Sequence, residues 1–572
     1  MINIIKKFRI LLDKRQKKRI VLLFFITLIG AFLEVLGVTL MVPLITAIMQ
    51  PDIITTNAAI AKVCAIFDLH SHKTFVIVCI AALIIVFIVK DVFLMFQYYA
   101  QARFVYNNRF LTQRQLLHAF LCKPYEYFLN SSSGEIMRIV NSDVAQTYGM
   151  LLTLLQFATE SIVSAALIIS IFVIDPVMTG VIAALLCIIL LVIAKVIKPI
   201  LQKKGKEFRT HSSQTYKWLL QSIQGIKEIK IAHKEEYFEK NYEASGYKQI
   251  SAEKWENVFN NAPRLMIEMG CVCSTLAVIA LMIYFGKPLE ELLPALGAFA
   301  MAAVKLMPSA NRIVNAVNAI AFQGPAIDNL ITTLETLEEP TQTQKESKHS
   351  LSVDDKIEMK DIVYKYPNTS VNVLDDASML VPAGKSVGIV GSSGAGKTTA
   401  VDVMLGLLSP EKGQILTDGK DVMTDYADWL SHIGYIPQSI FMLDDSIKAN
   451  VAFGSEPDEE RVWHALKEAQ LEQFVKGLPD GIDTKIGERG VRLSGGQRQR
   501  IGIARALYTD PEMLVFDEAT SSLDNETEAA IMESINSLHG KKTMIIIAHR
   551  LQTIEGCDMV YRVKDGKIER ER

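Results

Sequence analysis

Long apolar runs dominate the chain before residue 325, and they are separated by charged segments. A helix needs about 20 consecutive apolar residues to cross the hydrocarbon core of a bilayer. A window of that length finds roughly six such runs. Their approximate limits are Ile20–Ile48, Thr74–Tyr98, Leu151–Ile174, Met178–Ile197, Leu265–Phe285 and Leu293–Ile320. The pattern predicts an all-helical membrane domain with six spans.

Lysine and arginine between these runs orient the spans. The N-terminal stretch and the long connections Arg103–Arg138 and Lys195–Lys254 are basic, whereas the Asp175-Pro176 turn and the Gly286–Leu292 loop are short and poor in Lys and Arg. By the positive-inside rule, the N-terminus, both long connections and the C-terminal region are cytoplasmic. The first run is too long for a signal peptide and has no clear cleavage site, so it is interpreted as a permanent anchor. The long connections have a helical composition, so we expect the spans to continue as helices beyond the membrane.

The composition limits which classes of protein the chain can belong to. The chain has 572 residues, of which 50% are hydrophobic and 21% are charged. This length predicts two or more domains, and the apolarity exceeds that of a soluble globular protein. The formal net charge of -2 gives no sign of nucleic-acid binding, and no nucleic-acid partner is expected. The scattered cysteines are interpreted as packing residues.

A phosphate-binding loop lies in the polar C-terminal region. It fits the pattern G-x-x-x-x-G-K-[ST] and follows a short buried strand, Ser386–Val390. In such loops, backbone N–H groups and the start of a helix wrap a polyphosphate. Lys397 would supply charge to the β- and γ-phosphates, and the Thr398 hydroxyl would bind Mg²⁺. The candidate nucleotide-binding residues are Gly391, Ser392, Ser393, Gly394, Ala395, Gly396, Lys397, Thr398 and Thr399.

Two further segments complete a site for nucleotide hydrolysis. The apolar strand Leu514–Phe516 is followed by two carboxylates, of which Asp517 suits Mg²⁺ and Glu518 suits the base that polarises the attacking water. Between the phosphate loop and this strand in the sequence, a turn of serine and glycine residues precedes a basic helix. The exposed N–H groups at the start of that helix form an anion site. Its residues are Ser494, Gly495, Gly496 and Gln497.

In this order, the motifs resemble the ATPase domain of ABC transporters over residues 357–572. The resemblance implies ATP and Mg²⁺ as cofactors. It also implies that Tyr366 stacks on adenine, that Gln438 touches Mg²⁺ and the attacking water, and that His549 holds the γ-phosphate. Ser521–Asp524 is similar to the loop that crosses the dimer seam in this family.

The resemblance extends to architecture and assembly. It implies an all-α membrane domain of six helices with long cytoplasmic extensions at 1–334, a linker at 335–356, and an α/β P-loop ATPase domain at 357–572. The turn around Tyr127-Phe128 resembles the first intracellular turn of six-span exporters, where a short helix docks on the ATPase. In this family the turn that corresponds to Ser494–Gln497, called the signature turn, closes over the nucleotide held by the other subunit. A chain with one ATPase is therefore expected to form a homodimer in the cytoplasmic membrane, with the ATPase in the cytoplasm.

Ionisable residues within the spans are the candidate cargo contacts, because burying charge in a membrane is costly. Lys305 and Arg312 are seven residues apart and lie on one helical face. An inward-facing row of cations suits a phosphate or pyrophosphate head group. The alternative is structural: cations can pair with nearby carboxylates or extend to the membrane interface. The candidate substrate residues are Lys90, Arg264, Lys305 and Arg312.

Parts of the membrane half resemble bacterial flippases of polyprenyl-diphosphate-linked oligosaccharides. The segments that carry this resemblance are Ala262–Arg264, Leu306–Ile313, Gln323–Asp328 and Gly225–Lys230. The resemblance implies that the four cations bind the pyrophosphate and that Pro51–Lys73 forms an external helix lying against lipid.

The predicted function is therefore an ATP-driven flippase that moves a polyprenyl-diphosphate-linked oligosaccharide across the cytoplasmic membrane. Its expected partners are a second copy of the chain, the lipid-linked glycan and membrane lipid. An exporter of drugs, peptides or other lipids is the alternative, which an uncharged cavity would favour. An ABC ATPase that regulates a partner without transport is a further alternative, against which the complete hydrolytic motifs argue.

Overall fold

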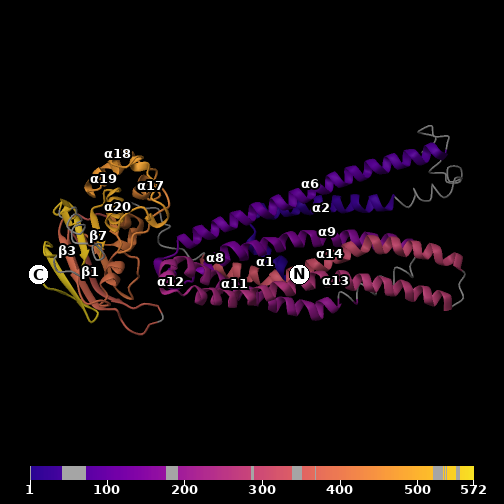
Figure 1. The fold of residues 1–572 in the computed structure, drawn as a ribbon, viewed down its shortest axis with the longest axis horizontal. Coiled ribbons are helices and arrows are strands. Elements are labelled where there is room, and N and C mark those ends of the chain that lie inside the picture. The colour runs from indigo at the N-terminus through magenta and orange to yellow at the C-terminus, as the bar shows by residue number, and fades with distance from the viewer. Residues whose placement is uncertain are drawn as a thin grey trace. The chain divides into compact units, whose positions relative to one another are not determined.

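The computed structural model describes residues 2–40, 72–174, 188, 191–284, 289–337, 351–367, 369–518, 532–533, 535, 537–548 and 554–572. The chain divides into two compact units (Figure 1). The helical unit comprises Met1–Leu121 and Ser131–Glu339, and the α/β unit comprises Cys122–Asn130 and Pro340–Arg572. Most of the predicted linker, at positions 338–350, lies outside the described residues.

Long helices make up the helical unit. They are α1 (Ile2–Leu11), α2 (Lys14–Thr39), α6 (His72–Leu121), α8 (Ser133–Arg138), α9 (Val144–Ile174), α11 (Lys198–Gln224), α12 (Ile226–Ala232), α13 (Glu235–Tyr284) and α14 (Leu289–Leu337), with π-helical turns at Ile139–Asp143 and Ile193–Ile197. Both α6 and α13 have 50 residues. At 1.5 Å per residue each is about 75 Å long, more than twice the hydrocarbon thickness. The predicted continuation of the spans as helices beyond the membrane is confirmed.

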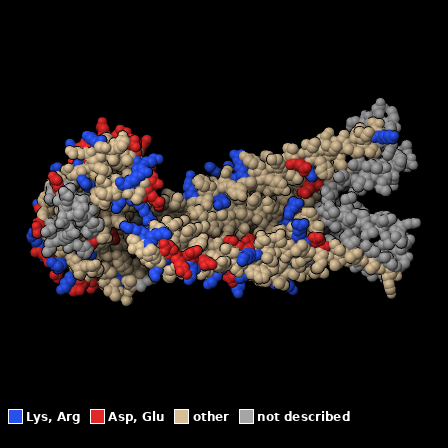
Figure 2. Space-filling model, in the orientation of Figure 1, with Lys and Arg blue, Asp and Glu red and all other residues tan. Residues whose placement is uncertain are grey.

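Parts of the helical unit that the structure describes have an apolar surface. Within the described residues, three helices are long and apolar enough to cross a membrane: Lys14–Gly37, Lys73–Leu121 and Ser133–Ala166. In the most apolar window of α6 only 6% of the residues are buried, so its apolar side chains need a lipid environment. Figure 2 shows charged side chains gathered over the α/β unit and sparse along the apolar part of α6. The predicted span Met178–Ile197 and external helix Pro51–Lys73 lie mostly outside the described residues.

Helices α11, α13 and α14 pack through one apolar cluster. Leu201, Ile267 and Val314 are among its buried members. Gly205 of α11 lies against the backbone of α14, and a Cβ at this position would come within 2.0 Å of the Phe322 carbonyl oxygen. Any side chain at Gly205 would therefore separate the two helices. This contact fixes α11 against α14.

Two sheets form the framework of the α/β unit. The first has the order β2-β1-β4-β5 and is antiparallel; the second has the order β10-β9-β3-β8-β7-β6 and is parallel except for β10. The strands are β1 (Lys356–Tyr364), β2 (Leu374–Pro382), β3 (Ser386–Val390), β4 (Lys412–Thr417), β5 (Lys420–Asp421), β6 (Ile433–Ile436), β7 (Met513–Asp517), β8 (Thr543–Ile547), β9 (Met559–Lys564) and β10 (Lys567–Arg570). Every residue of β3, β7 and β8 is buried. Such continuous apolar strands are typical of a parallel sheet covered on both faces.

Helices complete the α/β unit. They are α7 (Tyr125–Asn130), α15 (Lys397–Met404), α16 (Tyr426–Ser431), α17 (Ile447–Ala452), α18 (Glu459–Glu468), α19 (Glu472–Lys476) and α20 (Gly495–Leu507), with 3₁₀ turns at Val422–Asp425, Gly481–Asp483 and Glu488–Gly490. Because β3 and β7 are parallel members of one sheet, the segments that follow their carboxyl ends lie on the same edge. These segments hold the phosphate loop, the predicted Mg²⁺ ligand Asp517 and the predicted base Glu518. The predicted fold class is confirmed.

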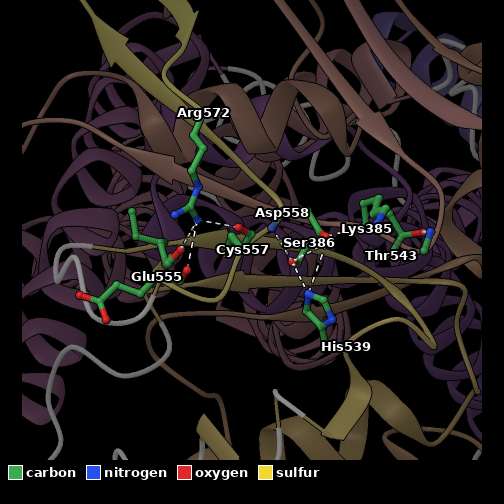
Figure 3. Close-up of polar contacts among 10 residues, drawn as sticks. Lys385, Ser386, His539, Thr543, Glu555, Cys557, Asp558 and Arg572 are labelled. Atoms are coloured by element: carbon green, nitrogen blue, oxygen red, sulfur yellow. Dashed lines mark hydrogen bonds and ion pairs between the residues drawn. The ribbon is translucent and has the colours of Figure 1, made fainter.

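A polar cluster fixes the opposite edge of the second sheet, where β3 begins (Figure 3). The Ser386 backbone N–H donates to Asp558 Oδ2 over 2.9 Å, and Ser386 Oγ lies 3.0 Å from both Asp558 Oδ2 and His539 Nε2. Ser386 is 2% exposed, and one imidazole nitrogen faces both oxygens. Since no second imidazole nitrogen joins the carboxylate to the hydroxyl, this is a structural contact and not a hydrolase triad.

Candidate nucleotide and substrate sites

The phosphate loop connects β3 to α15, as predicted. Gly396 has φ +101°, and Gly394 has φ +79° with open space where a Cβ would lie. These left-handed conformations favour glycine and leave the backbone N–H groups accessible to a phosphate. The Lys397 side chain crosses the loop and donates to the carbonyl oxygens of Gly391 and Ser392 over 3.1 and 3.2 Å.

The second half of the site comes from the end of β7. Thr398 Oγ1 at the start of α15 lies 3.3 Å from Asp517 Oδ1, and the Tyr435 hydroxyl donates to Asp517 Oδ2 over 3.2 Å. The Gln438 amide donates to Glu518 Oε2 over 2.7 Å. Residues that are far apart in the sequence thus meet beside the phosphate loop. The arrangement places a carboxylate and an amide where a water molecule attacking a bound phosphate could be oriented.

Glu518 has an unusual backbone conformation. Its φ is +48°, in the left-handed region that non-glycine residues enter at a cost of roughly 1–2 kcal/mol. A hydrogen bond of 3.1 Å from its N–H to the Ile547 carbonyl of β8 holds this conformation. Strain of this kind concentrates at functional sites. The turn directs the Glu518 carboxylate toward Gln438.

The oxygen ligands near Asp517 fit Mg²⁺. A magnesium ion prefers oxygen ligands, and in nucleotide sites it uses few protein groups because phosphates and water complete its shell. The Thr398 hydroxyl and the Asp517 carboxylate are adjacent, and Gln438 supplies a further amide oxygen. Burial raises the pKa of Asp517, and burial together with the Asp517 charge raises the pKa of Asp402 to about 6. A divalent cation at Asp517 would stabilise its ionised form.

Adenine contact is predicted for Tyr366, which follows β1. This residue is half-buried, and its hydroxyl lies 2.9 Å from Thr399 Oγ1 of α15. The tyrosine ring is therefore held next to the phosphate loop. Stacking on a base stays a prediction, and so does the nucleotide contact of Thr399.

The turn Ser494–Gln497 lies at the N-terminus of α20. The Gln497 N–H donates to Ser494 Oγ over 3.2 Å, and the Ser494 N–H donates to Gln497 Oε1 over 2.8 Å, which forms a reciprocal capping box. Ser494 and Gly495 are exposed and Gly496 is buried. An exposed helix N-terminus of this kind can bind a phosphate from another subunit.

The short helix α7 belongs to the α/β unit, although its neighbours in sequence belong to the helical unit. Glu126 Oε1 accepts a hydrogen bond of 2.8 Å from the Ser409 backbone N–H. Ser409 follows α15, which begins at the phosphate loop. The predicted docking of the first intracellular turn on the ATPase is thereby confirmed. The segment Gly225–Lys230, part of the resemblance to flippases, forms the start of α12 in the helical unit, with Gly225 as its N-cap.

A polar cavity of about 420 Å³ lies among the helices of the helical unit. Hydroxyl, amide and charged side chains line most of it, including Gln156, Asn260 and Asn315. Glu160 of α9 is 5% exposed and pairs with Arg312 of α14 over 2.5 Å. The side-chain oxygens of Asn260 and Asn315 are buried and make no hydrogen bond with any described residue. The cavity therefore offers free hydrogen-bonding groups together with one ion pair.

The predicted row of cations is only partly found at this cavity. Of the four candidates, Arg312 lines it, whereas Lys90 of α6 and Arg264 of α13 do not. Lys90 lies 3.1 Å from Asp91 and above the ring of Phe87, and Arg264 is exposed. Lys305 belongs to α14, but its side chain lies outside the described residues. The structural alternative thus accounts for Lys90.

The acidic and amide residues of the polar cavity were not predicted from the sequence, and some predicted residues lie outside the described part of the chain. Glu160 was missed, although an acidic residue inside a predicted span was an available signal. The amides Asn260 and Asn315 gave no signal, because polar amides are common in helices. His549 and Ser521–Asp524 lie outside the described residues.

Residues 374–521 match the ABC transporter family, and residues 19–287 match the ABC transporter transmembrane region. An ATP-dependent lipid A-core flippase of Saccharophagus degradans is 30% identical over 468 residues, covering 80% of this chain and 77% of that protein. The protein of the same name from Pseudomonas aeruginosa is 28% identical over 462 residues, covering 79% and 75%.

Among solved structures, a bacterial Atm1-family ABC exporter with ATP bound superposes with a TM-score of 0.74. The match covers 97% of this chain and 95% of that one, at 22% identity. At this identity the likeness concerns the fold alone.

Proposed function

The chain belongs to the ABC exporters, membrane transporters that hydrolyse ATP, and on this premise we propose that it flips a phosphate-bearing lipid from the cytoplasmic to the outer leaflet of the cell membrane. The observation that carries the lipid assignment is the polar, ion-paired cavity between α9, α13 and α14. An exporter of apolar drugs would need an uncharged cavity instead.

ATP binding follows from the family, and the residue roles are proposals. The loop from Gly391 to Thr399 binds the phosphates, and Tyr366 stacks on the adenine. Thr398, Gln438 and Asp517 hold Mg²⁺, which when bound neutralises charge on the β- and γ-phosphates. Glu518 accepts the proton of the attacking water, and Gln438, hydrogen-bonded to Glu518, orients that water.

A homodimer is proposed as the working assembly. Ser494 with its neighbours Gly495, Gly496 and Gln497 is presented at an exposed helix end, where it can bind a nucleotide held by the partner. His549 is assigned to the γ-phosphate. Each composite site then contains the phosphate loop of one chain and the signature turn of the other.

Recognition of the head group is assigned to the polar cavity. Arg312 has five N–H donors, and the hydrogen bond to Glu160 uses one of them. The remaining donors can bind a phosphate, and the amides of Gln156, Asn260 and Asn315 can bind sugar hydroxyls or further phosphate oxygens. Lys305 lies two turns from Arg312 on α14 and is retained as a candidate, as are Lys90 and Arg264 at positions away from the cavity.

The class of phosphate-bearing lipid includes the polyprenyl-diphosphate-linked oligosaccharide predicted from the sequence. The relatives described above are named for lipid A-core, and none is named for a polyprenyl-linked glycan. The amide-rich lining of the cavity supports a head group with hydroxyls as well as phosphate. The polyprenyl-diphosphate glycan is therefore a narrower proposal within the class.

Neutral substitutions of the ion pair separate substrate binding from structural pairing. Arg312→Gln should lower lipid flipping in proteoliposomes to below about a tenth, because each lost charge-assisted hydrogen bond contributes roughly 1.5–3 kcal/mol. The variant also leaves the buried Glu160 unpaired, which alone can destabilise the cavity. The double variant Glu160→Gln/Arg312→Gln removes that second effect.

We expect lipid flipping by the double variant to stay as low as that of Arg312→Gln. Its thermal unfolding temperature should return toward that of the parent. Recovery of flipping in the double variant would show that Arg312 serves only to neutralise Glu160. Lys254→Gln is the matched control, since Lys254 is exposed on α13 and does not line the cavity, and it should retain most of the activity.

A further inference from the structure

A second cavity, of about 660 Å³, lies in the helical unit where α1, α11 and α14 meet. Asn3, Ile4 and Lys7 of α1 form one side of it. The first turns of α11 form the second side, and the stretch of α14 from Val317 to Asp328 forms the third. The close contact of Gly205 with the Phe322 backbone holds α11 against α14 here, so these two walls are fixed relative to each other.

The cavity is strongly basic. Lys7 pairs with Asp328, which leaves three further lysines on α11: Lys198, Lys203 and Lys206. All three are exposed, and none forms an ion pair with a described residue. Three ammonium groups that lack an ion-pair partner among the described residues surround one cavity, and together they attract an anion with more than one negative charge.

The opposite part of the lining is apolar. Ile4, Val317 and Ile320 face the cavity, and a Cβ built at Gly324 meets no atom within 4 Å. The space beside Gly324 is therefore open and suits a hydrocarbon chain. A soluble anion would gain nothing from this wall, whereas an amphiphile buries its tail there.

The position of the cavity along the helices points to the membrane boundary. The predicted spans end at Ile197 and Ile320, and the basic residues of the cavity begin at Lys198. By the positive-inside rule this end is cytoplasmic. Basic pockets between helices at this level bind the head groups of anionic lipids.

This cavity is separate from the proposed transport cavity. Arg312, Asn315 and Ala319 of α14 line the transport cavity, whereas Val317, Ala321 and Gly324 line the basic one. At 3.6 residues per turn the two sets point in directions roughly 170° apart. A ligand in the basic cavity therefore lies on the other face of α14.

We propose that the cavity between α1, α11 and α14 binds the phosphate head group of an anionic lipid of the cytoplasmic leaflet, with its chain against Ile4, Val317 and Ile320. The lysines of α11 contact the phosphate, and the N-terminal helix α1 closes the site. The proposal does not depend on which lipid is transported.

Native mass spectrometry of the full chain in detergent tests it, with dioleoyl phosphatidate as the probe. The triple variant Lys198→Gln/Lys203→Gln/Lys206→Gln should weaken the tightest phosphatidate binding about tenfold or more. The matched control Lys234→Gln/Lys248→Gln/Lys254→Gln removes three exposed lysines outside the cavity and should bind as the parent does. Gly324→Leu fills the open space without changing any charge and should also weaken binding at least tenfold.

Equal phosphatidate affinity in the parent and in either cavity variant overturns the proposal. Displacement of phosphatidate from the parent by millimolar inorganic phosphate also overturns it, because the site would then bind a free anion. Arg312→Gln should leave this binding unchanged. Weakened phosphatidate binding in Arg312→Gln would assign the probe to the transport cavity and contradict the separate site.

Discussion

Replacing Glu518 with Gln should slow ATP hydrolysis by about two orders of magnitude or more while leaving ATP binding intact, because a positioned general base contributes on that scale. Glutamine keeps the shape of the side chain and its contact with Gln438, but it cannot accept a proton from water. Residue 518 directly follows β7, and its backbone hydrogen bond to Ile547 does not involve the side chain, so the substitution removes the base without changing this contact.

The measurement is steady-state ATPase activity in proteoliposomes, paired with equilibrium binding of ATP. Glu460→Gln on α18 is the matched control, because Glu460 is exposed and belongs to none of the segments that form the nucleotide site. ATP hydrolysis by Glu518→Gln at the parental rate would show that Glu518 is not the general base. Loss of ATP binding together with turnover would instead indicate a damaged fold.

A mixed dimer with Ser494→Arg in one subunit and Lys397→Ala in the other should hydrolyse ATP, whereas neither mutant homodimer should. Lys397 lies in the phosphate loop and Ser494 at the exposed start of α20. If each nucleotide lies between the loop of one chain and the turn of its partner, the mixed dimer keeps one intact composite site. Both homodimers then have a lesion in each site.

The control places both substitutions in one subunit beside an unaltered partner, so that every composite site has one lesion. Purified mixed dimers, isolated with two different affinity tags, are compared by ATPase rate. Activity in the first arrangement and not in the control supports sites shared between subunits. Equal rates in the two arrangements, or activity in the mutant homodimers, would contradict them.

Much of the nucleotide site could be predicted from the sequence because its chemistry depends on short contiguous segments. The phosphate loop is set by the glycines between Gly391 and Gly396, and its position between a buried strand and a helix follows from local periodicity. The proximity of Thr398 and Asp517 also followed, because the loop before Thr398 leaves the carboxyl end of β3, and Asp517 ends β7 of the same parallel sheet. The contact between Gln438 and Glu518 needed the resemblance to a known family.

The substrate cavity could not be predicted in the same way. The spacing of Lys305 and Arg312 shows that they share a helical face, but it does not show what that face meets. Glu160, the partner of Arg312, comes from a helix about 150 residues earlier in the chain, and the rotation of that helix is set by packing. The same limit applies to Asn260 and Asn315, which become significant only when three helices bring them together.

ATP-dependent movement of a phosphate-bearing lipid between leaflets tests the central claim most directly. The chain is reconstituted into vesicles that contain a fluorescent phosphate-bearing lipid, and the fraction accessible to an external quencher is followed after ATP is added. The account predicts that ATP changes this fraction with the parent but not with Glu518→Gln, and that Arg312→Gln reduces the change strongly. An unchanged fraction with an ATPase-active parent would contradict the assignment as a flippase of phosphate-bearing lipids.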